Sequence, residues 1–203
     1  MDHRPAEAAG VVGVLLAAGI GRRFDPSGAR LKLLEPARAG LHAGAPIAIA
    51  AVRNLKSAVA HVIAVVRPAD TEQHQLLHAR LSSEGIELVV NPRADDGMGT
   101  SIACGVAHTR GAAGWLIALA DMPAIDPRTI SAVREAIAGG ATTAAPFVGG
   151  QRGHPVGFAR ALAAQLCALQ GDEGARLILQ NYPPRRLAVD DAGALLDIDL
   201  PGD

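Results

Sequence analysis

Four short apolar runs, each ended by a polar or glycine-rich segment, constrain the fold of this chain more than any other feature. The runs cover residues 11–16, 61–66, 86–90 and 115–120. They are rich in Val, Ile and Leu and short for buried helices, so they predict buried strands. A weaker strand is expected over residues 142–146, and two further short strands are expected over residues 186–190 and 195–198.

Helical patterns lie between these runs. Helices are expected over residues 46–55, 71–81, 127–138, 159–169 and 173–181, and another from Thr100 or Ser101 to His108. Asp70 and Asp126 are suited to cap the helices over 71–81 and 127–138. Strands that alternate with helices favour a mostly parallel sheet covered on both faces. We therefore predict a Rossmann-like three-layer α/β/α fold.

Length and composition indicate one soluble globular domain over residues 1–203. Hydrophobic residues make up 49% of the 203 residues and charged residues 19%, a balance typical of folded proteins. Aromatic residues are only 2% and the net charge is −1, so nucleic-acid binding is not expected. The chain shows no secretory signal, and its first apolar run is too short to span a membrane. We expect a cytoplasmic protein with no membrane partner.

Candidate site residues follow all four of the stronger predicted strands. Gly19 and Gly21 come after the first strand, Arg67 after the second, Asn91 after the third and Asp121 after the fourth. In parallel α/β sheets the ligand site lies beyond the carboxyl ends of the strands. The sequence therefore predicts a site at this edge.

The segment after the first strand reads LAAGIGRR over residues 16–23 and is followed by Lys32. Glycines let the backbone approach phosphate oxygens, and Arg22 and Lys32 can supply positive charge. Taken alone, the segment could equally be a tight strand-to-helix turn. The dinucleotide pattern GxGxxG fails because Phe24 stands at the third glycine, and the P-loop pattern fails because no GK[ST] occurs.

Together with Lys32, the LAAGxGxR segment resembles the signature of the MobA-like nucleotidyltransferases, and in particular the branch of molybdenum cofactor cytidylyltransferases. Five further segments resemble that branch in its order: residues 97–105 (GMGTSIACG), 121–123 (DMP), 152–156 (RGHPV), 171–176 (GDEGAR) and 196–199 (LDID). The resemblance runs over nearly the whole chain. It implies a fold of the nucleotide-diphospho-sugar transferase type.

The resemblance also implies an activity, the transfer of CMP from CTP to the phosphate of a molybdopterin-type cofactor with release of pyrophosphate. A molybdoenzyme or its maturation chaperone would then receive the product. The implied nucleotide contacts are Leu16, Ala17, Ala18, Gly19, Gly21, Arg22, Lys32, Asn91 and Ser101, and the implied contact to the second substrate is His154. The implied catalytic residues are Arg22, Lys32 and Asp121, and the implied Mg²⁺ ligands are Asp121 with Asp197 or Asp199. Carboxylates beside phosphate oxygens suit Mg²⁺, and Mn²⁺ fits the same oxygens.

Several alternatives stay open at this point. Ala18 resembles the cytidylyl type, whereas the guanylyl type tends to carry glycine there. The acceptor could be another small phosphorylated compound, such as a sugar phosphate, and the domain could bind nucleotides without catalysis. The stretches 24–32 and 35–45 look like insertions relative to the family. Asp172 could pair with Arg176 along a helix or touch a substrate.

Overall fold

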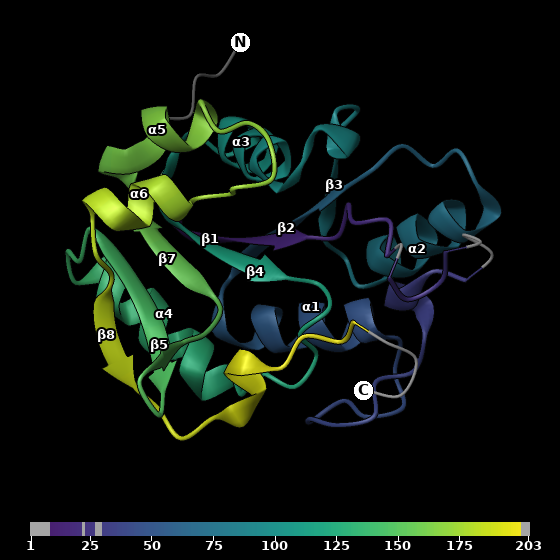
Figure 1. Ribbon diagram of the computed structural model, residues 1–203, viewed down its shortest axis with the longest axis horizontal. Coiled ribbons are helices and arrows are strands. Elements are labelled where there is room, and N and C mark those ends of the chain that lie inside the picture. Colours follow the sequence, from purple (N-terminus) through teal and green to yellow (C-terminus); the bar gives the residue numbers. More distant parts are fainter. Residues whose placement is uncertain (1–8, 22, 27–29, 200–203) are drawn as a thin grey trace, which may run out of the picture.

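In the computed structural model, which describes residues 9–21, 23–26 and 30–199, the strands form one twisted sheet (Figure 1). Its order is β3-β2-β1-β4-β7-β5-β6, and β8 pairs with β5. The strands are β1 (Ala9–Leu16), β2 (His61–Val66), β3 (Glu87–Val90), β4 (Ala112–Leu119), β5 (Thr143–Val148), β6 (Gln151–Arg152), β7 (Val156–Ala159) and β8 (Arg185–Ala188). Strands β1 to β4 are parallel, and β7 runs antiparallel to β4 and β5.

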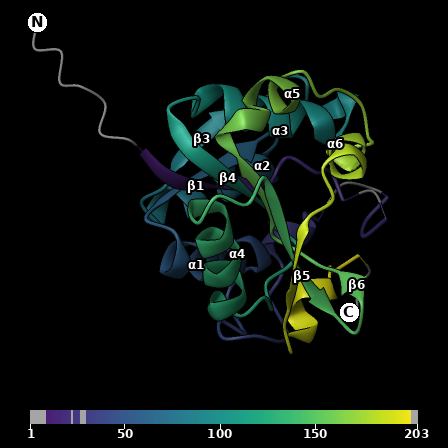
Figure 2. The same ribbon diagram turned by 90° about the vertical axis from the view of Figure 1, so that its left-hand side faces the viewer.

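Helices cover both faces of the sheet (Figures 1 and 2). The α-helices are α1 (Ile47–Ala58), α2 (Glu72–Ser83), α3 (Met98–His108), α4 (Pro127–Ala138), α5 (Ala163–Cys167) and α6 (Arg176–Asn181). Short 3₁₀ helices are η1 (Lys32–Leu34), η2 (Ala94–Asp96), η3 (Arg160–Leu162) and η4 (Ala192–Leu195). Helices α1, α2 and α4 pack in one apolar core, and α3, α5 and α6 pack in the other. None of the helices described is both long and apolar enough to cross a membrane.

The alternation of side chains along a strand explains why there are two cores. On β1, Val12 and Val14 pack on the side of α3, whereas Leu15 packs on the side of α1, because successive side chains of a strand point to opposite faces. The central parallel strands are therefore apolar on both faces, as the continuous apolar runs of the sequence predict. The predicted three-layer α/β/α fold is confirmed.

The C-terminal third differs from the sequence-based expectations. Residues 156–159 form β7, and the helix expected over 159–169 begins only at Ala163. Gly157 permits the close packing of this strand on α4, because a Cβ there would lie 2.5 Å from Ile137 of that helix. The strand expected over 195–198 is absent. The backbone N–H of Ile198 instead donates a single bond to the Asp121 carbonyl, at 3.0 Å.

Two helix starts also differ. Thr71, not Asp70, caps α2, because its side chain accepts a hydrogen bond from the backbone N–H of His74. Helix α3 begins at Met98, two or three residues earlier than expected, directly after Gly97 with φ 108°. This earlier start brings the first turn of α3 to the carboxyl edge of the sheet, beside the end of β3.

The close packing of α3 on the sheet depends on Gly105. A Cβ at this position would lie 2.6 Å from Cγ1 of Val14 and 2.9 Å from Cγ2 of Val65, and real Cβ atoms do not approach neighbours so closely. We expect Gly105→Val to lower the free energy of unfolding by about 2 kcal/mol, because forcing extra atoms into a packed core costs about 1–3 kcal/mol. Urea denaturation followed by circular dichroism measures this change.

Gly111→Ala is the matched control, because a Cβ at Gly111 would meet no atom within 4 Å. Its free energy of unfolding should lie within about 0.5 kcal/mol of the wild-type value. A Gly105→Val protein as stable as the wild type would contradict the close approach of α3 to β1 and β2.

Candidate active site

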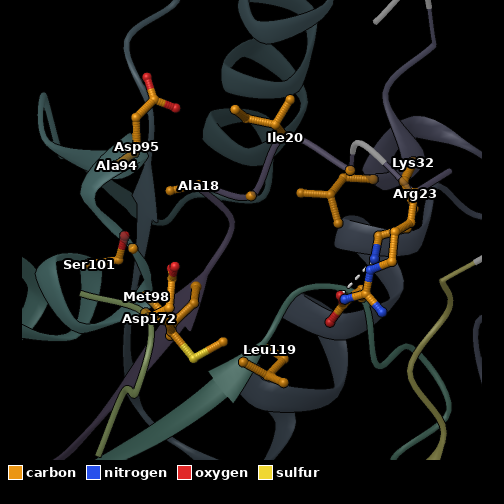
Figure 3. A pocket seen from close by; sticks show the side chains of 16 residues that line it. Ala18, Ile20, Arg23, Lys32, Ala94, Asp95, Met98, Ser101, Leu119 and Asp172 are labelled. Atoms are coloured by element: carbon orange, nitrogen blue, oxygen red, sulfur yellow. Dashed lines mark hydrogen bonds and ion pairs between the residues drawn. The ribbon is translucent and has the colours of Figure 1, made fainter. Parts of the chain in front are cut away.

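The carboxyl ends of β1, β3 and β4 meet at a pocket of about 490 Å³ (Figure 3). One end of the pocket is bordered by the glycine loop and by the side chains of Arg23, Lys32 and Asp121. The other end is bordered by η2 and the start of α3, including Ser101. The edge of the sheet at which the sequence predicts a site is therefore hollowed, and its two ends differ in chemistry.

The glycine loop after β1 presents its backbone to the pocket. Ala18, Gly19 and Gly21 line the pocket, and Gly21 has φ 70°, a conformation that favours glycine. Ala17 is different, because it is only 2% exposed and its side chain packs in the core. Its backbone N–H donates to the Val65 carbonyl at 2.8 Å. Ala17 thus anchors the loop to β2, and its neighbours face the pocket.

A cation bound by two carboxylates lies at one end of the pocket. The Nζ atom of Lys32 is 2.8 Å from Oδ2 of Asp121 and 3.5 Å from Oδ1 of Asp199. Lys32 is buried, and the exposed guanidinium of Arg23 also pairs with Asp199. Arg22 lies outside the described residues. Both carboxylates therefore face one common point, which the ammonium group of Lys32 occupies.

Main-chain hydrogen bonds bring the two carboxylates together. The N–H of Ile198 donates to the Asp121 carbonyl at 3.0 Å, which holds the C-terminal segment against the turn after β4. On the other side of that turn, the buried amide of Asn54 donates to the Pro123 carbonyl at 2.9 Å. Asp197 is exposed and does not line the pocket. Of the two carboxylates that the sequence leaves open, Asp199 is the one that faces Asp121.

This pair of carboxylates has the chemistry of a divalent-cation site that is completed by a ligand. Among the described residues, no three His, Cys, Asp or Glu side chains gather closely enough to hold a metal ion by themselves. Mg²⁺ is usually bound by one or two carboxylates together with phosphate oxygens and water. Asp121 and Asp199 fit that pattern, because both already reach the same ammonium group.

Buried polar groups shape the opposite end of the pocket. Asn91 is 3% exposed and donates from Nδ2 to the hydroxyls of Thr100, at 2.9 Å, and Ser101, at 3.0 Å. Its Oδ1 accepts from the backbone N–H of Arg93 at 3.0 Å. Asn91 therefore lies behind the pocket wall and orients Ser101, which lines the pocket. The sequence does not distinguish these two positions, because both residues follow the same strand.

Arg67 has a similar supporting place at the end of β2. Its side chain is only 12% exposed, and Nη2 lies 2.7 Å from Oδ1 of Asp95 in η2. Asp95 lines the pocket and Arg67 does not. Asp95 and Asp172 are pocket residues that the sequence-based site set omits, and only the resemblance of residues 171–176 to a family segment gave a signal for Asp172.

His154, the expected contact to a second substrate, lies beside the carboxylate end and outside the pocket. Its backbone N–H donates to the Ala194 carbonyl at 2.9 Å, and its Nδ1 atom is buried without a hydrogen-bond partner among the described residues. Burial lowers the pKa of the His154 imidazole and Arg152 lowers it further, against the opposing effect of Asp121. The surroundings of the ring therefore favour its neutral form.

Comparison with curated proteins identifies relatives that match most of the chain. The purine catabolism protein PucB of Bacillus subtilis is 31% identical over 199 residues, covering 94% of this chain and 92% of PucB. Nicotine blue oxidoreductase of Paenarthrobacter nicotinovorans is 30% identical over 182 residues, covering 85% of this chain and 83% of the relative. These two names describe different roles, so family membership alone does not give the reaction.

Solved structures show the same fold. Rv0371c from Mycobacterium tuberculosis H37Rv has a TM-score of 0.79 at 25% identity, covering 96% of this chain and 94% of that one. A manganese complex of Rv0371c gives a TM-score of 0.73 at 26% identity, covering 94% of each chain. Molybdopterin-guanine dinucleotide biosynthesis protein A from Archaeoglobus fulgidus, at 16% identity and a TM-score of 0.62 with 94% and 93% of the chains covered, shares the fold. The family described as MobA-like NTP transferase domain matches residues 13–187, and this chain belongs to it.

Proposed function

We propose that the chain is a nucleotidyltransferase that moves CMP from CTP to the phosphate of a molybdopterin-type cofactor and releases pyrophosphate. The observation that carries this proposal is that the glycine loop lines the same pocket as Lys32 and Asp121, with Asp199 paired to Lys32 beside it. A triphosphate needs backbone N–H groups and cations, and a divalent ion needs carboxylates. The pocket supplies all three within one cavity.

The residues at the carboxylate end suit in-line transfer at the α-phosphate. The incoming phosphate of the acceptor is itself the nucleophile, so no covalent intermediate with the protein is required. Lys32 and Arg23 can offset the negative charge that develops on the phosphoryl oxygens. A divalent ion, when bound by Asp121 and Asp199, supplies further charge neutralisation. The manganese complex of Rv0371c supports a divalent metal in this fold.

Lys32 gives the pocket a means to exchange charge. Its ammonium lies against both Asp121 and Asp199, and Arg23 also pairs with Asp199. A bound triphosphate offers Lys32 a second set of oxygens, and its departure from the carboxylates opens the position between Asp121 and Asp199 to a divalent ion. Nucleotide and metal are therefore expected to bind together. The triphosphate attracts Lys32 away from the carboxylates, and the metal takes the position that Lys32 leaves.

The choice of CTP is supported by Ala18. Its methyl group lines the pocket and narrows it, where glycine would leave more room for a purine base. A single contact of this kind is worth only about 1–3 kcal/mol, so the base preference is tested directly. Pyrophosphate release is measured with purified protein, Mg²⁺, molybdopterin cofactor and each of CTP, GTP, ATP and UTP.

Release with CTP alone supports the whole proposal. Release with GTP keeps the transferase and overturns the base assignment. Protein that is folded and binds CTP but releases no pyrophosphate overturns the molybdopterin acceptor, in favour of another phosphorylated acceptor or a non-catalytic domain. Folded protein that binds no nucleotide overturns the transferase itself.

In that assay, Asp199→Asn should lower kcat/KM by about 100-fold or more, because it removes charge from the point that Asp121 also faces. Asp197→Asn is the matched control, since the same substitution two residues away alters an exposed side chain and leaves the pairs of Lys32 with Asp121 and Asp199 in place. It should keep activity within about twofold of the wild type. An equal loss of kcat/KM in the two variants would show that Asp199 has no role that Asp197 lacks.

Lys32→Met should change metal and nucleotide binding in opposite directions. Without nucleotide, Mn²⁺ should bind about tenfold tighter, because an ammonium that competes for both carboxylates has been removed. CTP should bind about tenfold more weakly, because a cation that holds phosphate has been lost. Electron paramagnetic resonance of free Mn²⁺ measures the first change, and calorimetry measures the second.

Lys56→Met is the control for the loss of one lysine. Lys56 is exposed on α1 and donates to the backbone carbonyl of Glu84, away from the pocket. Its Mn²⁺ and CTP affinities should equal those of the wild type. Weaker Mn²⁺ binding by Lys32→Met would contradict the exchange of Lys32 for the metal.

A further inference from the structure

Asp172 is a pocket carboxylate that pairs with no cation of the described residues. Among these residues three Asp side chains line the pocket, Asp95, Asp121 and Asp172. Asp95 pairs with Arg67, and Asp121 pairs with Lys32. Asp172 makes no hydrogen bond or ion pair with any described residue, and it cannot form a helical pair with Arg176 because α6 begins only at Arg176. Its acceptor oxygens are thus open to a ligand.

The backbone fixes Asp172 against the start of α3. The N–H of Gly99 donates to the Gly171 carbonyl at 2.8 Å. Gly97 has φ 108°, and a Cβ there would lie 2.5 Å from Oδ1 of Asp172. A side chain at Gly97 would therefore displace the carboxylate, and the two glycines let the segment around Asp172 lie directly on the helix.

This contact places Asp172 at the nucleoside end of the pocket. Figure 3 shows Asp172 beside Met98 and near Ser101, across the pocket from Lys32 and Arg23. If the triphosphate lies along the glycine loop toward Lys32, the sugar and base extend toward Asp172.

The charge of Asp172 argues for a specific hydrogen-bond donor on the ligand. A carboxylate repels a polyanionic nucleotide, even at an exposed position such as that of Asp172. Hydrogen bonds donated by the ligand offset it, because a bond to a charged acceptor is stronger than one between neutral groups. An ionised carboxylate accepts hydrogen bonds and donates none. The nucleoside half of CTP offers two donor groups, the vicinal hydroxyls of ribose and the exocyclic amine of cytosine.

We propose that Asp172 selects the nucleotide by accepting hydrogen bonds from its nucleoside half, with the ribose diol as the donor that matches both carboxylate oxygens. This inference rests on the proposed function, because it needs a nucleotide in the pocket. Asp172 then acts as a specificity residue that touches substrate, and the segment 171–176 gains a role that its sequence alone leaves open.

Calorimetric binding of CTP, 2′-deoxy-CTP and UTP in the presence of Mg²⁺ tests this role without the acceptor. The wild type should bind CTP about tenfold tighter than 2′-deoxy-CTP. In Asp172→Asn that ratio should fall close to one, through weaker binding of CTP and unchanged or tighter binding of 2′-deoxy-CTP. If the amine is the donor, the ratio of CTP to UTP falls instead, and the carboxylate role still holds.

Glu173→Gln is the matched control, because it removes the same charge from the neighbouring exposed residue, which does not line the pocket. Its two ratios should equal those of the wild type. If Asp172→Asn changes the affinities for all three nucleotides by the same factor, in either direction, the inference is overturned and the proposed function remains intact. Folded wild-type protein that binds none of them overturns both.

Discussion

The ion pair between Lys32 and the carboxylates of Asp121 and Asp199 connects three parts of the chain that are far apart in sequence. Lys32 comes from the segment after the glycine loop, Asp121 from the end of β4 and Asp199 from the C-terminal segment. A buried ammonium is stable only with such partners, because a charge removed from water without compensation is costly. The same three groups would supply the phosphate and metal contacts of a transferase, so the stability of this corner and its chemistry depend on the same charges.

The sheet makes this convergence possible. Four parallel strands end at one edge, and each continues into a loop that faces the pocket or supports it. Behind the residues that line the cavity lies a layer of buried partners. Asn91 holds Ser101, and Arg67 holds Asp95. Positioning by a second layer of this kind is how binding groups are kept close to a productive geometry.

The sequence predicts β1, β2 and β4 well because each is a continuous apolar run that is mostly buried on both faces, and it predicts the more exposed edge strand β3 from its Val and Leu residues. It does not predict β7, whose four residues enter the sheet between β4 and β5 out of chain order. It also cannot separate Asp197 from Asp199, since a two-residue shift of the C-terminal segment would put Asp197 where Asp199 lies. The bond from Ile198 to the Asp121 carbonyl sets that register, and it is a tertiary contact without a local signal.

The same limit applies to Ala17 and Asn91, whose sequence context does not tell a lining residue from a supporting one. Lys32 shows the opposite case. The insertion-like stretch 35–45 folds back on itself, with Ala37 donating to the Ala45 carbonyl at 2.8 Å, and Lys32 still reaches Asp121. None of residues 35–45 lines the pocket.

The central claim is that Asp121 and Asp199 exchange the Lys32 ammonium for a divalent ion when a nucleoside triphosphate binds. Anomalous diffraction at the manganese edge, from crystals grown with CTP and Mn²⁺, tests it most directly. The account predicts a manganese peak between the two carboxylates and CTP phosphate oxygens, with Nζ of Lys32 moved onto the triphosphate. A triphosphate in the pocket with Lys32 still bound to Asp121, and manganese elsewhere or absent, would contradict it.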